Sequence, residues 1–359
     1  MTESFSTPLE AVHTALGASF TEFSGWRMPV SYSSDLAEHA AVRTAAGLFD
    51  LSHMAEIVLI GPEAGAALDA ALADPTSGLE EGRAKYTLLQ QPDGGILDDL
   101  IVYRTGPDRF LVVANAGNRR LVASELVARA APFDVVVEDE TDDIALIALQ
   151  GPRAEEILRE VEGFDVPGLD GLRYYRSTPA DFRGHEVLVA RTGYTGEDGF
   201  EFYVSPEAAT SLWDALLETG AGSGLIPAGL AARDTLRLEA GMALYGHELD
   251  PATRRIGSGR DARIERAGRV LVGLAAQGRR AARAGYPVIA ASPDGDGVGA
   301  VVGEITSGAL SPSLGHPIAM AFVDPELTEP GTVLAVDVRG TELDATVVPL
   351  PFYRRPKES

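Results

Sequence analysis

Two adjacent carboxylates, Asp98 and Asp99, lie in the stretch "GGILDDLIVY" between a Gly-Gly turn and a run of strand-forming residues. Neighbouring side chains of a β-strand point to opposite faces, so only one of the two should face inward. An inward carboxylate can exchange a proton with a reacting group or stabilise a positive charge that develops during a reaction. The pair is therefore the first candidate for chemistry. The aspartate that does not face inward is expected in the turn or in solvent.

The stretch "RTGYTGEDGFEFY", residues 191–203, gathers glycines and acids around a tyrosine. One interpretation is a β-hairpin with an acidic turn. The other is that the strand alternation beginning at Glu201 aims this carboxylate into a pocket, where paired hydrogen-bond donors must offset its desolvation.

Two arginines in "GLAARDTLRLEAGM", Arg233 and Arg237, lie one helical turn apart and so on the same helix face. A solvated face with Asp234 and Glu239 as ion-pair partners would contribute little stability. Alternatively, one arginine turns inward and offers its planar guanidinium to a carboxylate.

The stretch "LFDLSHM", residues 48–54, sets Asp50 and His53 among apolar residues. A capping role or a hydrogen-bonded core histidine is at least as expected there as catalysis. The six histidines of the chain show no spacing typical of metal ligands, and there is no cysteine. We therefore predict no metal centre.

The bulk composition limits the class of protein. A chain of 359 residues exceeds what one hydrophobic core usually organises, so two or three domains are expected. The formal net charge of −23 would repel a polyanion, which argues against nucleic-acid and anionic-membrane partners. The N-terminus is polar and acidic, and no window approaches the ~20 apolar residues of a membrane span. A cytoplasmic protein is expected.

Hydrophobic periodicity predicts helices at 34–46, 117–131, 205–219 and 227–241. Ser34 should cap the first helix and Gly47 should end it, while Pro227 opens the last and Gly241 closes it.

Short strands are predicted elsewhere. Residues 51–115 alternate apolar runs with turn residues, and "QPDGG" and "TGPDR" are typical hairpin connectors. From residue 270 onward almost all of the sequence indicates strands of a small β-barrel or sandwich. Because strands and helices do not alternate strictly, we expect antiparallel α+β modules with an all-β C-terminal domain.

A series of colinear motifs runs over nearly the whole chain: "FSGWRMPVSY", "GLFDLSHM", "GGILDDLIVY", "VVANAGN", "LQGP", "RTGYTGEDGFE", "GLAARDTLRLEAGMALYGHELD", "AGYPV", "GEITSGALSPSLGHPIAMAFVD" and "PFYRR". Together they resemble the T-protein family of the glycine cleavage system, the aminomethyltransferases. The resemblance implies a three-domain cloverleaf around a central folate channel. Residues 1–50 and 143–250 would form one α+β domain, residues 51–142 a second that carries Asp99, and residues 251–359 the C-terminal β-barrel.

The resemblance also implies a reaction. The aminomethyl group on the lipoyl arm of H-protein would pass to tetrahydrofolate with release of ammonia, and no metal is needed. The family's key aspartate matches Asp99. Positions that match its folate-binding residues are Met54, Tyr86, Tyr103, Val113, Asn115, Tyr194, Glu201, Arg233 and, at the C-terminal contact, Tyr353 or Arg354. Glu201 would accept the paired N–H donors of the pterin, while flat rings would stack against the ligand.

One departure from the family pattern follows "YGHELDP", where "ATRRIGSGRDARIERAG" is shorter than the family's segment. A strand is expected to be missing there. This leaves open a degenerate paralogue that binds folate with weak or no transfer. Two related classes are disfavoured, because a folate-binding module of iron–sulfur assembly would carry a cysteine motif and an oxidase domain would be joined to a flavin domain.

The same departure opens an arginine-rich stretch, residues 254–283, in a chain that is otherwise acidic. Such a local reversal of charge can steer an acidic partner, either H-protein or a folate polyglutamate tail. The alternative is a solvated, arginine-rich helix face.

Overall fold

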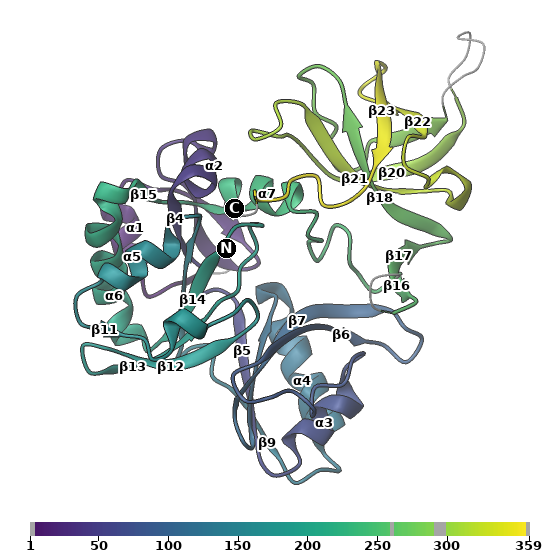
Figure 1. Ribbon diagram of the computed structural model, residues 1–359. Coiled ribbons are helices and arrows are strands. Elements are labelled where there is room, and N and C mark those ends of the chain that lie inside the picture. The colour runs from purple at the N-terminus through teal and green to yellow at the C-terminus, as the bar shows by residue number, and fades with distance from the viewer. Residues whose placement is uncertain (1–3, 259–261, 291–298, 357–359) are drawn as a thin grey trace. The chain divides into compact units, whose positions relative to one another are not determined.

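The structure is a computed structural model that describes residues 4–258, 262–290 and 299–356 (Figure 1). Within these residues the strands form four sheets. The chain divides into two compact units. The first unit comprises Met1–Leu89, Leu97–Gly193 and Glu197–Arg233, and the second unit comprises Gln90–Ile96, Tyr194–Gly196 and Asp234–Ser359. The predicted division into three domains around a channel stays a prediction.

A five-stranded sheet of the first unit carries the Asp98–Asp99 pair. Its strands, in spatial order, are β6 (Ala84–Gln90), β7 (Ile96–Gly106), β8 (Arg109–Ala114), β5 (Ala55–Ile60) and β9 (Val136–Asp139). Helices α3 (Ala64–Ala71) and α4 (Arg119–Ala130) cover one face, where Leu100 and Val102 of β7 share an apolar cluster with both helices (Figure 1). Because side chains alternate along a strand, Asp98 lies on this covered face and Asp99 on the opposite one.

A seven-stranded sheet provides the other large core of the first unit. Its strands, in spatial order, are β11 (Phe164–Asp165), β12 (Ser177–Phe182), β13 (His185–Ala190), β14 (Gly199–Val204), β10 (Ala145–Gln150), β4 (Ala46–Asp50) and β15 (Leu225–Pro227). Helices α5 (Ala154–Glu160) and α6 (Pro206–Gly220) lie along one face (Figure 1), where Phe200 and Phe202 join the apolar cluster of Trp213. Glu201, between the two phenylalanines, points to the other face.

Smaller elements complete the first unit. They are a three-stranded sheet in the order β1 (Phe5–Ser6), β3 (Trp26–Ser31), β2 (Ser19–Phe23), the helices α1 (Glu10–Ala15) and α2 (Asp35–Thr44), and the 3-10 helices η1 (Ala116–Asn118), η2 (Leu169–Gly171) and η3 (Ala221–Ser223). Ser34 caps α2 as predicted, accepting a hydrogen bond from the N–H of Ala37 at 3.1 Å. Gly47 does not end the helix. It lies in β4, where a Cβ atom would come within 2.5 Å of Val42 Cγ2, so close packing explains the glycine.

Helix α7 (Leu230–Glu239) starts later than predicted, because Pro227 ends β15 instead of opening the helix. Gly241 closes α7 as predicted. Its φ is +66°, and the N–H groups of Gly241 and Met242 return to the carbonyls of Leu238 and Arg237. Helix α3 was not expected within residues 51–115, and its run of alanines, the best helix formers, accounts for it.

The second unit contains an eight-stranded sheet. Its strands, in spatial order, are β16 (Thr253–Ile256), β17 (Arg263–Arg266), β18 (Arg269–Ala276), β21 (Pro317–Val323), β20 (Val301–Leu310), β19 (Pro287–Ala290), β22 (Val333–Asp337) and β23 (Glu342–Val348), and η5 (Pro325–Leu327) follows β21. Strand β23 also pairs with β18, so the last six strands of this order close into a barrel (Figure 1). The predicted α+β class with a C-terminal β-barrel is confirmed.

Candidate active site

Asp99 lies half-buried on the face of the five-stranded sheet opposite α3 and α4. Its Oδ2 atom accepts a hydrogen bond from the hydroxyl of Tyr86 on β6 at 3.1 Å. Its Oδ1 atom accepts one from Nδ2 of Asn115, which follows the end of β8, at 2.9 Å. Three of the residues predicted from the sequence are thus brought together by adjacent strands.

Asp98 is fully buried, which corrects the prediction that it lies in the turn or in solvent. Its carboxylate accepts three hydrogen bonds, from the backbone N–H of Asn115 at 3.1 Å, from Asn115 Nδ2 at 2.7 Å and from Asn118 Nδ2 at 2.9 Å. These amides precede α4 and replace the water that the carboxylate loses. Burial and the charge of Asp99 raise the pKa of Asp98 to about 7, although the three hydrogen bonds act in the opposite direction.

Glu201 is the second buried carboxyl of the site. It accepts hydrogen bonds from the hydroxyls of Thr192 and Tyr103, the latter at 3.2 Å, and Tyr203 donates to the Tyr103 hydroxyl at 3.2 Å. Burial raises the pKa of Glu201, while the hydrogen bond from Thr192 and the charge of Arg233 lower it. The inward orientation and the hydroxyl donors are those that the pocket interpretation of this strand requires.

The remaining predicted residues of the first unit are Tyr103, Val113, Met54 and Arg233. Tyr103 is fully buried on β7, four residues beyond Asp99 and on the same face. Val113 is 7% exposed and lies opposite Ile101 in the β7–β8 ladder. Met54 is half-buried directly before β5, and Arg233 is half-buried on α7.

Asp50 and His53 are both buried and differ in their hydrogen bonds. Asp50 accepts a hydrogen bond from Thr7 Oγ1 at 2.6 Å and pairs with Nε2 of the buried His13 at 2.8 Å. The Nδ1 atom of His53 is buried and has no hydrogen-bond partner among the described residues. Burial and the charge of Arg233 lower the pKa of His53 to about 4, so its ring is neutral near pH 7.

Glu56 on β5 is a buried acid that sequence reasoning missed. Neither of its carboxyl oxygens has a hydrogen-bond partner in the part of the chain that the structure describes. Burial raises the pKa of Glu56 well above its usual range. A signal was available, since "MAEIVLIG" contains one acid in an otherwise apolar strand.

The other predicted residues belong to the second unit. The hydroxyl of Tyr194 donates a hydrogen bond to the carbonyl of Ala243. The backbone N–H of Tyr353 donates to the carbonyl of Glu239 at 2.7 Å, and the neighbouring Arg354 is exposed.

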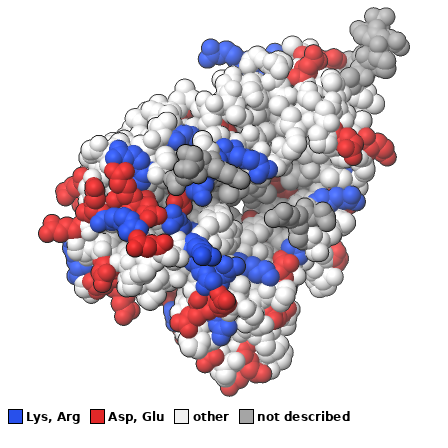
Figure 2. Space-filling model, viewed as in Figure 1, with Lys and Arg blue, Asp and Glu red and all other residues white. Residues whose placement is uncertain are grey.

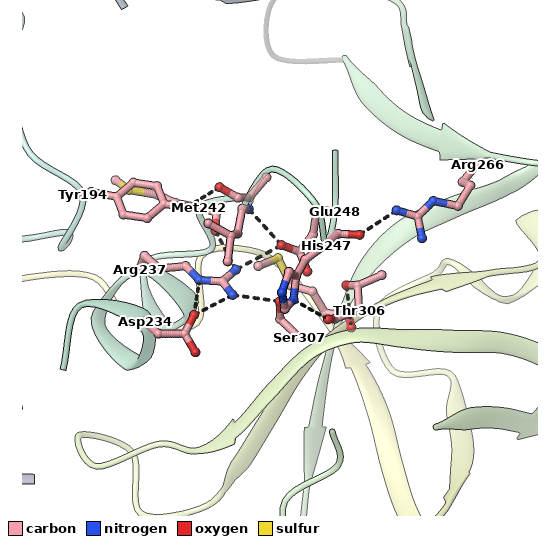
Figure 3. Close-up of polar contacts among 12 residues, drawn as sticks. Tyr194, Asp234, Arg237, Met242, His247, Glu248, Arg266, Thr306 and Ser307 are labelled. Carbon is pink, nitrogen blue, oxygen red and sulfur yellow. Dashed lines mark hydrogen bonds and ion pairs between the residues drawn. The ribbon is translucent and has the colours of Figure 1, made fainter. Parts of the chain in front are cut away.

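Arg237 is fully buried, so α7 does not present a solvated arginine face along its length (Figure 3). Its guanidinium pairs with Glu248 at 3.0 Å and with Asp234 at 2.7 Å. The carboxylate of Glu239, the other predicted partner, accepts hydrogen bonds from the hydroxyls of Ser311 and Ser313. The spacing of the two arginines was visible in the sequence, but their different burial was not.

The described arginines of the arginine-rich stretch lie on β16, β17 and β18 and in the irregular segment after β18, and none of them lies on a helix, which corrects the alternative interpretation. Several of its arginines pair with acids of the same unit, among them Arg254 with Asp93 at 2.7 Å, Arg263 with Glu265 at 2.7 Å, Arg266 with Asp250 at 2.8 Å and Arg269 with Asp324 at 2.9 Å. Arg260 and Asp261 lie outside the described residues. On the face drawn in Figure 2, basic side chains lie among acidic ones. Steering of an acidic partner by this stretch stays a prediction.

Two further features concern metals and membranes. Within residues 4–258, 262–290 and 299–356, no three His, Asp or Glu side chains are grouped so that they could hold a metal ion. None of the described helices combines the length and the apolar character needed to cross a bilayer.

An α+β protein that ends in a β-barrel, and that holds buried carboxyls among tyrosine hydroxyls and amides, is suited to an aromatic ligand rich in N–H donors. Residues 9–265 match the family model described as the GCVT N-terminal domain. Residues 269–354 match the glycine cleavage T-protein C-terminal barrel domain. The chain belongs to the glycine cleavage T-protein family.

Known proteins are similar to this chain over nearly its full length. The aminomethyltransferase of Cutibacterium acnes is 52% identical, covering 99% of this chain and 100% of that protein. The aminomethyltransferase of Saccharopolyspora erythraea is 51% identical, covering 97% of this chain and 98% of that protein. The crystal structure of the glycine cleavage system aminomethyltransferase T from Bartonella henselae has a TM-score of 0.87 at 34% identity and covers 98% of each chain. The predicted enzyme class, an aminomethyltransferase of the glycine cleavage system, is confirmed.

Proposed function

We propose that this enzyme transfers the aminomethyl group carried by the lipoyl arm of H-protein to tetrahydrofolate and releases ammonia. The observation that carries the proposal is the arrangement along β7. Asp99, with Tyr86 and Asn115, shares one strand face with Tyr103, whose hydroxyl is bound to Glu201. A carboxylate that can act on an amine is thus four residues from a tyrosine–carboxylate pair that can recognise a pterin edge.

In the proposed reaction, the methylene carbon exchanges its bonds to the lipoyl sulfur and to the amino nitrogen for bonds to N5 and N10 of the folate. The two protons lost by the folate nitrogens end on the thiol and on ammonia. Asp99 is proposed to hold the folate amines in line, to stabilise the positive charge that develops at nitrogen and to accept a proton. Tyr86 and Asn115 hold both oxygens of that carboxylate.

Glu201 is proposed to accept the amino and ring N–H groups of the pterin, which form a side-by-side donor pair. Tyr86, Tyr103 and Tyr194 are proposed to supply aromatic contact, Met54 and Val113 apolar contact, and Arg233 a positive charge near the ligand. Asn115 is proposed to contact the folate as well as Asp99, and Tyr353 or Arg354 to provide the C-terminal contact. Tetrahydrofolate acts as a co-substrate, and a cytoplasmic location stays a prediction.

The decisive experiment supplies the purified protein with aminomethylated H-protein and tetrahydrofolate and measures methylenetetrahydrofolate and ammonia. Formation of both products in equal amounts is expected. Binding alone is checked by thermal melting, because a ligand that binds only the native state adds about 2.7 kcal/mol of stability at a hundredfold excess over Kd. Folate binding without either product would instead indicate the degenerate paralogue.

A further inference from the structure

The buried guanidinium of Arg237 organises a segment of the second unit, residues 242–248, that follows α7 (Figure 3). Its Nη1 atom donates to the carbonyl of Met242 at 3.3 Å and to Oε2 of Glu248 at 3.0 Å. Its Nη2 atom donates to the hydroxyl of Ser307 on β20 at 2.8 Å. One planar group therefore ties both ends of the segment to a strand of the barrel.

Glu248 adds a second tie from inside the segment. Its side chain is fully buried, and the Oε2 atom that binds Arg237 also accepts the backbone N–H of Leu244 at 2.9 Å. The positions of Met242 and Leu244 are thus both set by the Arg237–Glu248 pair. Ala243 lies between them, so its carbonyl has little freedom to move.

That carbonyl is the acceptor of the Tyr194 hydroxyl. Tyr194 is half-buried and lies in a glycine-flanked loop, whose backbone does not by itself restrict where the ring points. The hydrogen bond to Ala243 connects the ring to the segment that Arg237 and Glu248 hold.

We propose that the Arg237–Glu248 pair is a positioning device that fixes Tyr194 for folate binding. The inference rests on the proposed function, in which Tyr194 contacts the folate. A buried ion pair contributes little net stability compared with apolar residues of the same size, because the desolvation of two charges offsets their attraction. The charge-assisted bond to Glu248, together with the donations of the same planar guanidinium to Met242 and Ser307, does impose one geometry, and that is the property a ligand-contacting ring requires.

The test is a double-mutant cycle on the full chain, with the Kd of tetrahydrofolate measured by calorimetry. Tyr194→Phe removes the hydroxyl contact with Ala243 and should weaken binding about three- to tenfold, the range of one neutral hydrogen bond. Glu248→Gln keeps the shape of the side chain and removes its charge, and a similar loss is expected. The double variant should be no weaker than the worse single variant, because both changes release the same ring.

A steady-state assay separates positioning from general damage. Glu248→Gln should raise KM for tetrahydrofolate while kcat at saturating folate stays within about twofold, since Asp99 lies on a different element. Asp324→Asn is the matched control, because it breaks the Arg269–Asp324 ion pair of the same unit, and it should leave KM and Kd unchanged. If Glu248→Gln does not fold, Ser307→Ala frees one arm of the guanidinium and should show the same non-additivity with a smaller loss.

The positioning role would be overturned if the affinity loss of the double variant equalled the product of the two single losses. A kcat that falls by the same factor as KM rises would also overturn it. A Kd that is indifferent to Tyr194→Phe and to Tyr194→Ala would overturn it together with the assignment of Tyr194 to the folate site. None of these results decides whether the wild-type protein forms methylenetetrahydrofolate and ammonia, and that assay tests the proposed function separately.

Discussion

Asp98 and Glu201 of the first unit and Glu248 of the second illustrate two ways in which a buried carboxyl is compensated. In the first unit, Asp98 and Glu201 receive hydrogen bonds from amides and hydroxyls. In the second unit, Glu248 is bound directly by the guanidinium of Arg237. Neutral donors leave the pKa of the first two carboxyls raised, whereas a bound guanidinium supplies a full counter-charge and a forced geometry.

The type of hydrogen-bond donor distinguishes buried carboxyls that can take part in chemistry from those that hold the structure in place. A carboxyl with neutral donors can still gain a proton or accept a ligand's N–H groups near neutral pH. A carboxylate bound by a guanidinium is committed to that partner, so its value lies in what it holds in place. The following changes test whether this division is correct.

The largest effect is expected from Asp99→Asn, which should lower the transfer rate by roughly 10² to 10⁴ with a much smaller effect on folate affinity. The neutral amide keeps the shape of the side chain but removes its charge and its capacity to take up a proton. Single-turnover transfer from aminomethylated H-protein measures the rate. Asp98→Asn is the control on the adjacent position and should act mainly through stability; an inactive Asp98 variant beside a normal Asp99 variant would reverse the two roles.

A smaller effect is expected from Glu201→Ala, which should weaken tetrahydrofolate binding by about 1 to 3 kcal/mol because the pterin donors lose their acceptor. Calorimetry measures this directly. Glu197→Gln is a control from the loop that precedes β14, since Glu197 is paired with Arg43 at 2.8 Å and its replacement should affect stability but not affinity. Equal affinities for wild type and Glu201→Ala would remove Glu201 from the site.

Glu56 sharpens the comparison further, because its carboxyl oxygens have no partner among the described residues. The pKa of Glu56 is raised in the folded protein, so the folded protein holds a proton that the unfolded chain releases above about pH 4.3. The free energy of unfolding therefore falls as the pH rises above that value. Glu56→Gln imitates the protonated form.

Urea unfolding at two pH values tests this. The stability of the variant relative to wild type should rise between pH 5 and pH 8, by about 1.4 kcal/mol for each pH unit over which Glu56 is protonated in the folded protein and ionised in the unfolded chain. The same difference at both pH values would mean that Glu56 is ionised throughout.

The smallest expected effect is a shift in the pKa of Asp98. In the Asp99→Asn variant, the pKa of Asp98 should fall below the value of about 7 expected for the wild type, because a neighbouring negative charge is removed while burial is unchanged. Carboxyl carbon NMR during a pH titration reports it. A pKa that does not move would show that burial alone sets the proton affinity of Asp98.

The sequence by itself determined much of the architecture, because the relevant signals are local. The Ser34 cap, the helices near residues 119–130 and 206–220, the closing turn at Gly241 and the strands of the barrel follow from side-chain periodicity and turn chemistry. Colinear motifs identified the family and through it selected Glu201, whose inward orientation strand alternation had left as one of two interpretations.

Only the tertiary structure decided how each polar side chain is compensated. Asp98 is buried because amides that follow β8 reach it, and Arg237 differs from Arg233 because Glu248 and Ser307 enclose its guanidinium. Gly47 belongs to a strand rather than a helix end because Val42 lies against it. Alternation predicts which face a residue takes, but desolvation and pairing depend on groups that are distant in sequence, and those groups meet only when the chain has folded.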